Sequence, residues 1–292
     1  MKRISLFLLT NISIMFLFSI ILNVIGIEKN NLYNLIILSG IIGFSGSIIS
    51  LIFSKWISLY SVGGKIIKNP NKKIEIWILK TIKKQSKKIG INVPEIAIYL
   101  SDNINAFATG RSSKHSLIAI STGLIEKMKK LEIEAVLAHE ITHIKNGDMI
   151  TMILIQGIIN TFVIFFSKII LKILSCLFYD EKENSYDSKK GTLFFFIISF
   201  LLEFLFGFFA NIIIMWFSRK REFYADAGAA KIVGKSKIIS ALKRLKESNE
   251  PNEPKNVSSL CINGKKKKFL EIFMSHPTLK KRIQALYNNE YL

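Results

Sequence analysis

The stretch "VLAHEITHIKNGD", residues 136–148, contains two histidines and a glutamate in the pattern H-E-x-x-H. Residues four apart on a helix lie on one face, with Cβ atoms roughly 5–6 Å apart, so His139 and His143 can aim two imidazole nitrogens at one point. Glu140, one step round the helix, can reach a water on a metal ion there without binding the ion. This is the geometry of zinc-dependent peptide hydrolysis, in which a carboxylate takes the proton of the water and delivers it to the leaving amine.

The same pattern could also be a satisfied pair of helix histidines. With only four histidines in the chain, chance would rarely produce this spacing. The surrounding segment has helical apolar spacing from about Leu131, with Ile133, Val136 and Leu137 available for burial. We therefore predict a packed helix that holds a catalytic Zn²⁺, one ion per subunit.

Two histidines leave a catalytic zinc one protein ligand short. The candidates for the third ligand are His115, His276 and a carboxylate. Glu222 and Asp226, in "SRKREFYADAGAAKIVG", are four apart on a predicted helix and should face the same way. One of them could bind the ion while the other holds the second ring nitrogen of a ligand. Alternatively, the acidic pair could be a solvated face paired with neighbouring arginines.

The composition indicates a membrane protein. The chain has 292 residues, of which 50% are hydrophobic, and a net charge of +20. So apolar a chain is atypical of soluble domains, and the positive charge suits lipid headgroups better than nucleic acid. Abundant Lys, Ile, Asn and Phe are also typical of AT-rich genomes, which weakens the charge as a functional signal. The two cysteines form no disulfide framework or C-x-x-C pair.

Four apolar segments approach the roughly 20 residues that cross a bilayer. They form two hairpins, in residues 1–65 (spans about 4–27 and 32–59) and 149–217 (spans about 149–179 and 192–217), and separate two catalytic parts, residues 66–148 and 218–292. Lys and Arg near the span ends place both termini and the active site on the cytoplasmic side. Lys168 and Lys172 leave open whether the third segment crosses or lies against the membrane. Glu203, midway along the fourth segment, suggests a functional or interhelical polar contact, or a tolerated residue.

The catalytic parts mix helix and strand signals. Residues 72–90 and 131–148 have helical apolar spacing, residues 95–100 alternate as a strand does, and "NAFATG" and "SLIAIST" resemble a strand pair. Asn105, Ala106 and Phe107 could form an edge strand that pairs with an extended substrate, or belong to a simple hairpin. Residues 249–268 are predicted to form a loop.

"HEITH", followed by a hydrophobic hairpin, "SRKREFYAD" and "FMSHPTLKKRI", resembles the HtpX-type family of membrane zinc metalloproteases, related to the CAAX prenyl proteases. The similarity covers essentially the whole chain. It implies zinc ligation by His139, His143 and Glu222, Glu140 as general base and a supporting role for Asp226. His276 belongs to a motif similar to one of this family and could donate to the tetrahedral oxyanion, or Ser275 and Pro277 could instead make this segment a helix cap.

The resemblance implies an integral membrane, mainly α-helical protein with a zincin-like α+β cytoplasmic domain. The expected activity is endoproteolysis of misfolded or damaged membrane proteins in the bacterial inner membrane under stress, alongside an ATP-dependent membrane protease. Two alternatives stay open. A zinc-bearing scaffold would be expected to have four protein ligands and no spare carboxylate. An exopeptidase would need a site for a free terminus, which the sequence does not reveal.

Overall fold

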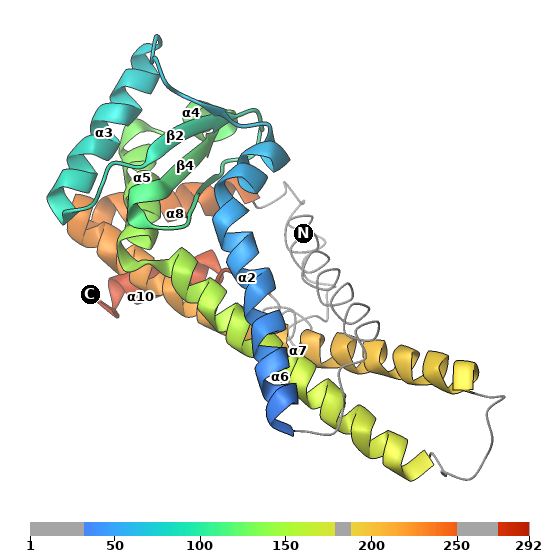
Figure 1. The fold of residues 1–292 in the computed structure, drawn as a ribbon. Coiled ribbons are helices and arrows are strands. Elements are labelled where there is room, and N and C mark those ends of the chain that lie inside the picture. Colours follow the sequence, from blue (N-terminus) through green and yellow to red (C-terminus); the bar gives the residue numbers. More distant parts are fainter. Residues whose placement is uncertain (1–31, 179–187, 250–273, 292) are drawn as a thin grey trace. The chain divides into compact units, whose positions relative to one another are not determined.

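The computed structural model describes residues 32–178, 188–249 and 274–291 (Figure 1). The expected first span, residues 4–27, and almost all of the expected loop, residues 249–268, lie outside the described residues. The chain divides into two compact units, formed by residues 1–50 with 153–214 and by residues 51–152 with 215–292. Each unit is described by itself.

The helices and strands follow one another along the chain. The first elements are α2 (Leu32–Val62), β1 (Lys65–Ile66), α3 (Lys73–Ile89), β2 (Glu95–Tyr99), β3 (Ala106–Gly110), the short 3-10 helix η1 (Ser113–His115) and β4 (Ser116–Ser121). They are followed by α4 (Thr122–Lys127), α5 (Lys130–Asn146), α6 (Asp148–Phe178), α7 (Ser188–Val233), α8 (Lys235–Asn249) and α10 (Leu279–Tyr287). The helices expected around residues 72–90 and 131–148 are confirmed.

Within the described ranges, three helical stretches are long and apolar enough to cross a membrane: Leu35–Val62, Asp148–Ser175 and Phe194–Val233. α7 extends beyond Phe217, the expected end of the fourth span. The helix continues to Val233 and ends before Gly234, which has a φ of 97°. The residues after Phe217 are mostly good helix formers, so the apolar run and the acidic pair share one continuous helix.

Polar side chains join α6 and α7 within the first unit. Lys168 Nζ lies 2.8 Å from Ser199 Oγ and 3.4 Å from Glu203 Oε1. The side chain of Glu203 is 8% exposed. An ion pair in an apolar surrounding satisfies two groups that are costly to leave alone there. The interhelical polar contact predicted for Glu203 is thereby confirmed.

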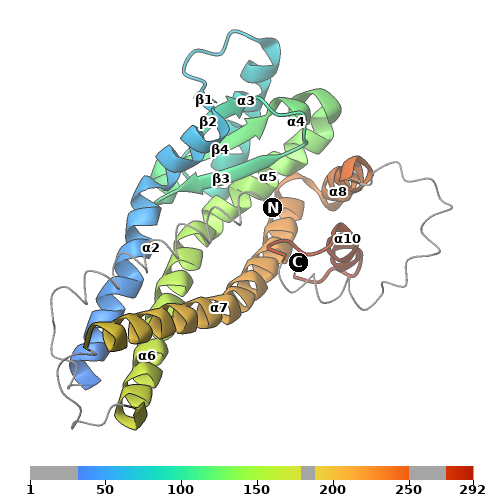
Figure 2. The ribbon, with the colours of Figure 1, turned by 90° about the vertical axis from the view of Figure 1, so that its right-hand side faces the viewer.

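A four-stranded sheet organises the second unit, with the strand order β1-β2-β4-β3 (Figure 2). β2 and β4 are parallel, and β3 pairs antiparallel with β4, with Ala106 opposite Ile120. The expected strand pair is therefore confirmed. Among the described strands, β3 is the edge strand beside β4.

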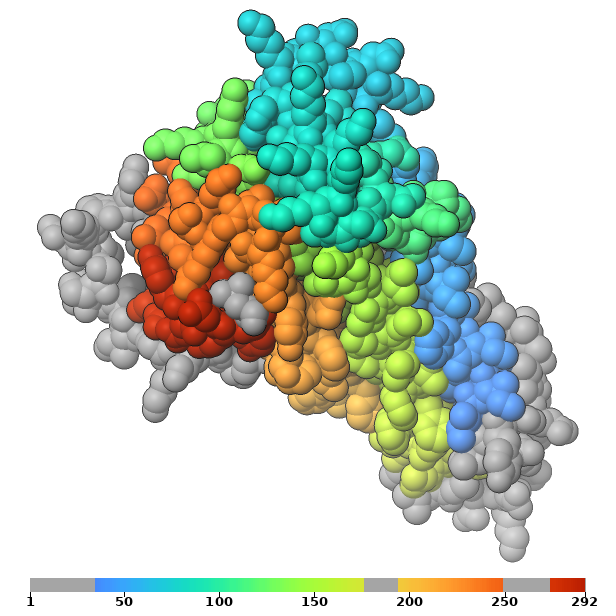
Figure 3. All heavy atoms as spheres, turned by 90° about the vertical axis from the view of Figure 1, so that its left-hand side faces the viewer, coloured from blue at the N-terminus to red at the C-terminus, as the bar shows by residue number. Residues whose placement is uncertain are grey.

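The two faces of this sheet are covered differently because side chains alternate along each strand. Ile96, Ile118 and Ile120 point into the larger core, which they share with α3, α5 and α8. The opposite face carries Ala97, Tyr99, Leu117 and Ala119, and packs against the end of α2. Because α5 shares the larger core with the sheet, α3 and α8, that core fixes α5, the helix that carries H-E-x-x-H. In the same unit, α8 and α10, orange and red in Figure 3, lie next to each other.

Candidate metal centre

α5 is a well-anchored helix. Its first turn is capped by Glu132, whose Oε2 accepts a hydrogen bond from the Lys129 backbone N–H at 2.9 Å. One face of the helix buries the side chains of Ile133, Leu137, Ile141 and Ile144. The helix ends at Gly147, whose φ of 67° is a left-handed conformation that glycine adopts without strain. The packed face holds the histidine-bearing face in a fixed position.

α7 carries the acidic pair to the same place. Glu222 and Asp226 are four residues apart on this helix, and both are buried, with exposed fractions of 4% and 2%. Gly228, two residues further on, lies directly against the side chain of Thr142 on α5. The absent side chain at Gly228 therefore lets the two helices approach closely. The alternative of a solvated acidic face is wrong, because these carboxylates are buried among groups of α5 and α10.

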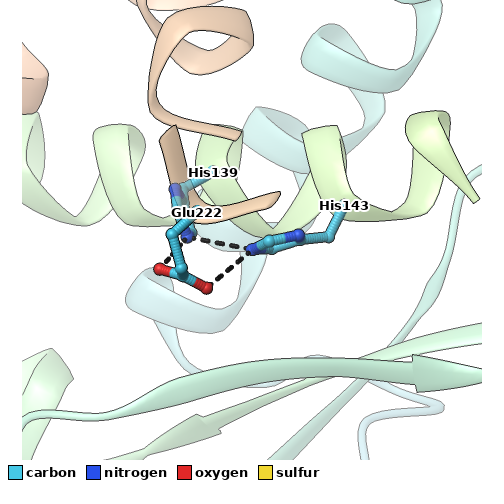
Figure 4. Close-up of side chains that lie close together, drawn as sticks. All are labelled: His139, His143 and Glu222. Atoms are coloured by element: carbon cyan, nitrogen blue, oxygen red, sulfur yellow. Dashed lines mark hydrogen bonds and ion pairs between the residues drawn. The ribbon is translucent and has the colours of Figure 1, made fainter. Parts of the chain in front are cut away.

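His139, His143 and Glu222 converge on one point (Figure 4). The Nε2 atoms of the two histidines are 3.1 Å apart. The Glu222 carboxylate lies 3.5 Å from His139 Nε2 through Oε2, and 3.4 Å from His143 Nε2 through Oε1. With one donor atom taken from each residue, the three atoms all lie within 4.8 Å of one another.

This group of donors suits a zinc ion. Ligand atoms roughly 2.0–2.1 Å from a tetrahedral zinc lie about 3.3 Å from each other. The two histidine nitrogens, 3.1 Å apart, lie near that value, and each of them has a different oxygen of Glu222 at 3.4 or 3.5 Å. Three protein ligands also leave a tetrahedral ion its fourth position, as in catalytic rather than structural zinc sites.

Each histidine is oriented by a carboxylate at its other ring nitrogen. Asp226 Oδ1 lies 3.0 Å from His139 Nδ1, and Asp148 Oδ2 lies 2.6 Å from His143 Nδ1. When the Nδ1–H group of a neutral imidazole donates a hydrogen bond to a carboxylate, Nε2 keeps a free lone pair. Both Nε2 lone pairs are then directed at the same point, where a cation is needed to relieve their repulsion. The structure therefore places Asp226 next to His139, and its supporting role at the metal stays a prediction.

Two further cationic or polar groups surround Glu222. Arg282, on α10, approaches Glu222 Oε2 with Nη1 at 2.8 Å and binds both oxygens of Asp226, with Nη2 at 2.6 Å and Nε at 2.7 Å. His276 Nδ1 lies 3.0 Å from Glu222 Oε1, and its side chain is 64% exposed. α10 begins at Leu279 with Thr278 in the cap position, so Ser275 and Pro277 do not cap it.

The electrostatics of the site favour positive charge. Burial lowers the pKa of His139, but hydrogen bonds to Asp226 and Glu222 outweigh burial and raise that pKa above its ordinary value. Burial also lowers the pKa of His143, and a hydrogen bond and the charge of Glu222 again raise it on balance. The pKa of Arg282 is raised in the same way against burial, chiefly by the charges of Asp226 and Glu222. The cluster therefore holds protons or a metal cation at the histidines.

Glu140 lies where the proposed base should be. It lines the same cavity as His139, Glu222 and His276, and it is 8% exposed. Among the described residues, it is not one of the group that could hold a metal ion. This position agrees with the H-E-x-x-H geometry expected of a helix.

The edge strand reaches the site in part. Asn105 and Ala106 line the cavity of the metal centre. Phe107 does not line it, because its side chain points to the other face of the sheet and packs on Tyr99, with ring centroids 5.9 Å apart. The Ser121 N–H donates to the Asn105 carbonyl, so alternation along the antiparallel pair turns the Phe107 backbone toward β4 and the Ala106 backbone toward the free edge. His115 is exposed in η1 and belongs to no metal-binding cluster among the described residues.

Three residues of the site were not predicted from the sequence. Arg282 lies within the quoted motif "FMSHPTLKKRI" but was given no role. Asp148 follows His143 by five residues, and Arg221, which forms an ion pair with Asp148, directly precedes Glu222. A carboxylate soon after the second histidine was a usable signal, because ligating histidines almost always donate their other N–H to such a group. Arg282 binds Asp226, which lies 56 residues away in the chain, so no local sequence pattern indicated this contact.

Comparisons with known proteins identify the family of this chain. Residues 72–290 match the model of "Peptidase family M48". Over its full length, the chain is 56% identical to "Protease HtpX" of Buchnera aphidicola subsp. Schizaphis graminum and 50% identical to that of Yersinia enterocolitica, each covered over 100% of its length. It is 57% identical to that of Wigglesworthia glossinidia brevipalpis, of which 99% is covered.

A solved structure shares the fold. The crystal structure of S. mikatae Ste24p matches with a TM-score of 0.63 at 19% identity, over 94% of this chain and 61% of that chain. The fold class expected from the sequence, a mainly helical membrane metalloprotease with a small α+β part, is confirmed. The chain therefore belongs to peptidase family M48, and within it to the HtpX-type membrane metalloproteases.

Proposed function

We propose that this metalloprotease is a zinc-dependent endopeptidase that cleaves misfolded or damaged membrane proteins at the cytoplasmic face of the bacterial inner membrane. The observation that supports the zinc chemistry best is the convergence of His139, His143 and Glu222, whose donor atoms, one from each residue, lie within 4.8 Å of one another. Bound there, a zinc ion would polarise the scissile carbonyl and acidify a water.

The chain's own residues supply the remaining steps. Glu140 takes a proton from the attacking water and returns it to the amine that leaves. The free edge of β3, next to Asn105 and Ala106, holds the substrate as an added strand by backbone hydrogen bonds. His276, largely exposed at the rim of the cavity, donates a hydrogen bond to the oxyanion of the tetrahedral intermediate.

The role of Glu140 is tested with purified full-length protein, zinc analysis and a misfolded model membrane protein. Glu140→Gln should keep the zinc of the wild type and lose at least ~100-fold in cleavage rate, the range of general acid–base catalysis. Glu134→Gln is the matched control on the same helix, since Glu134 pairs with Lys237 outside the cavity and should change neither quantity. Undiminished proteolysis by Glu140→Gln would overturn the proposed mechanism.

The ligand assignment is tested by metal analysis of His139→Ala and Glu222→Ala. Both variants should lose most of their zinc, and equal zinc in the wild type and both variants would remove the assignment.

Cleavage of peptides with blocked termini separates endopeptidase from exopeptidase activity. For the cytoplasmic face, a cysteine placed at the exposed position Lys114 should react with a membrane-impermeant reagent in inverted vesicles, but not in intact cells.

A further inference from the structure

The free edge of β3 depends on the loop that leads into it, residues 101–105. Ile104, Asn105 and Ala106 line the cavity of the metal centre, so the chain enters β3 directly at that centre. A strand at the edge of a sheet has backbone hydrogen bonds to a neighbouring strand on one side only. The position of its first residues, and with it the position of a paired substrate, therefore depends on the contacts that hold this loop.

Ser121, the last residue of β4, holds the loop through its hydroxyl. The hydroxyl oxygen accepts from the Asn105 backbone N–H at 3.0 Å and donates to the Asn103 carbonyl at 2.8 Å. It also accepts from the Leu124 backbone N–H at 3.1 Å and so caps α4, which follows β4 directly (Figure 2). These bonds use the one donor and both acceptor positions of a hydroxyl. Ser121 is 0% exposed, so bulk water does not compete for them.

The Ser121 hydroxyl acts at the point where strand pairing begins. The Ser121 N–H donates to the Asn105 carbonyl at 3.0 Å, as in an antiparallel ladder, whereas the Asn105 N–H bonds the side chain of Ser121. Backbone groups alternate in direction along an antiparallel pair, so the N–H and C=O of Ala106 are turned to the free edge. Ser121 therefore fixes the residue directly before the first backbone groups that a substrate strand would meet.

The two residues after Ser121 hold the other end of the loop. Thr122 Oγ1 accepts from the Ser101 backbone N–H and donates to the Ser101 carbonyl, each at 3.1 Å. The Gly123 N–H donates to the same carbonyl at 2.8 Å. A side chain at Gly123 would overlap the Asp102 carbonyl, so glycine permits this close approach. Ser121, Thr122 and Gly123, the STG turn, thus bind both ends of the loop.

We propose that the STG turn is a positioning element for proteolysis, which holds the start of β3 where a paired substrate presents its scissile bond to the metal. This inference rests on the proposed function, in which the substrate adds to the β3 edge. Ser121 does not line the cavity, so it is a positioning residue that acts through Asn105 and Ala106. Without its hydroxyl, the start of β3 is free to shift, and small displacements of a bound substrate weaken catalysis.

The test compares two quenched fluorescent peptides with blocked termini and identical residues next to the scissile bond, cleaved by zinc-loaded full-length protein. The long peptide can pair with the whole of β3, and the short one cannot. The wild type should cleave the long peptide with a kcat/KM at least ~10-fold higher, because each added backbone hydrogen bond favours binding. Ser121→Ala should lose most of this gain, chiefly through a higher KM, with unchanged zinc content. A purely structural defect would lower cleavage of both peptides equally.

Ser116→Ala is the matched control on the same strand. Ser116 is also buried, and its hydroxyl donates to the Ser113 carbonyl at 3.0 Å, but it pairs with Gly110 at the far end of β3. This variant should keep the gain with peptide length. Thr122→Val removes the second hydroxyl at nearly constant volume and should lose part of the gain. Because Thr122 is partly exposed, this variant also serves should Ser121→Ala fail to fold.

Amide hydrogen exchange tests the same contact without catalysis. Residues 103–108 should exchange faster in Ser121→Ala than in the wild type, whereas exchange in α5 should stay the same. A full gain with peptide length in both Ser121→Ala and Thr122→Val would overturn this inference alone. A wild type that cleaves both peptides equally would instead remove strand pairing from the proposed function, and a wild type that cleaves neither would remove the endopeptidase itself, and this inference with it.

Discussion

Arg282 binds both carboxylate oxygens of Asp226, through Nη2 at 2.6 Å and Nε at 2.7 Å, although 56 residues separate them in the chain. The same guanidinium reaches Glu222 with Nη1 at 2.8 Å. One buried cation thereby compensates two buried carboxylates and joins α10 to α7. The bidentate geometry is specific to arginine.

Arg282→Met should destabilise the zinc-free protein by about 3–5 kcal/mol, because it leaves buried carboxylates without a compensating charge. Added zinc should restore part of this loss, since a bound cation compensates the same groups. The measurement is thermal unfolding in detergent with and without zinc. Arg244→Met is the control: its exposed pair with Glu247 should contribute little. Equal melting temperatures for Arg282→Met and Arg244→Met would contradict the role of Arg282.

Asp148→Asn should weaken zinc binding roughly 10–100-fold, the usual effect of removing the group that orients a ligating histidine. Asp148 holds His143 Nδ1 at 2.6 Å and also pairs with Arg221. Arg221→Gln should have a smaller effect in the same direction, because it acts on His143 only through Asp148. Competition with a fluorescent zinc chelator measures both. Asp102→Asn, at an exposed position away from the site, should leave the affinity unchanged, and the prediction fails if Asp148→Asn does so too.

Gly228→Ala should separate α5 from α7 and lower zinc content. The added methyl would overlap the Thr142 side chain, and overpacking costs about 1–3 kcal/mol, more than the roughly 0.5–1 kcal/mol that alanine gains over glycine in a helix. Thr142→Ala removes the overlapping atoms, so the double variant should recover zinc. Gly207→Ala is the control in the same helix, where the new methyl meets nothing within 4 Å. Full zinc content in Gly228→Ala would contradict the close approach.

As the pH is lowered, zinc should dissociate at a higher pH than it would from a site whose histidines had the usual pKa. Burial lowers the pKa values of His139 and His143, but their acidic partners raise both above the usual value of about 6.5, so protons compete with zinc already above that pH. Zinc affinity measured from about pH 8 to pH 5 should therefore fall steadily. A constant affinity over this range would contradict the shared site.

The zinc-free protein should show the opposite trend. A raised folded-state pKa contributes stability that is fully present below the unfolded pKa of about 6.5, and this contribution is lost as the pH rises through the folded pKa. As the pH rises above about 6.5, chelator-treated protein should therefore lose the contribution of these two histidines to its folding stability. Zinc-loaded protein should gain stability over the same pH range. Melting temperatures recorded against pH, with and without chelator, check the sign.

The sequence by itself determined the parts of the site that one helix sets. Spacing of four residues places His139 with His143, and Glu222 with Asp226, on single helix faces whatever the rest of the chain does. Apolar runs likewise predicted α2, α6 and most of α7, because a long apolar stretch has few alternatives to a membrane helix. The edge strand followed from the resemblance of "NAFATG" and "SLIAIST" to a short strand pair.

Only the tertiary structure decided which distant groups meet. It excluded His115 from the site, turned the Phe107 side chain to the other face of the sheet, and brought Arg282 to the acidic pair. It also formed the cavity over Ala135 and Ala241, two alanines that nothing in the sequence distinguishes from core residues. The physical reason is range: backbone geometry fixes neighbours three or four residues apart, whereas these contacts depend on how whole helices pack.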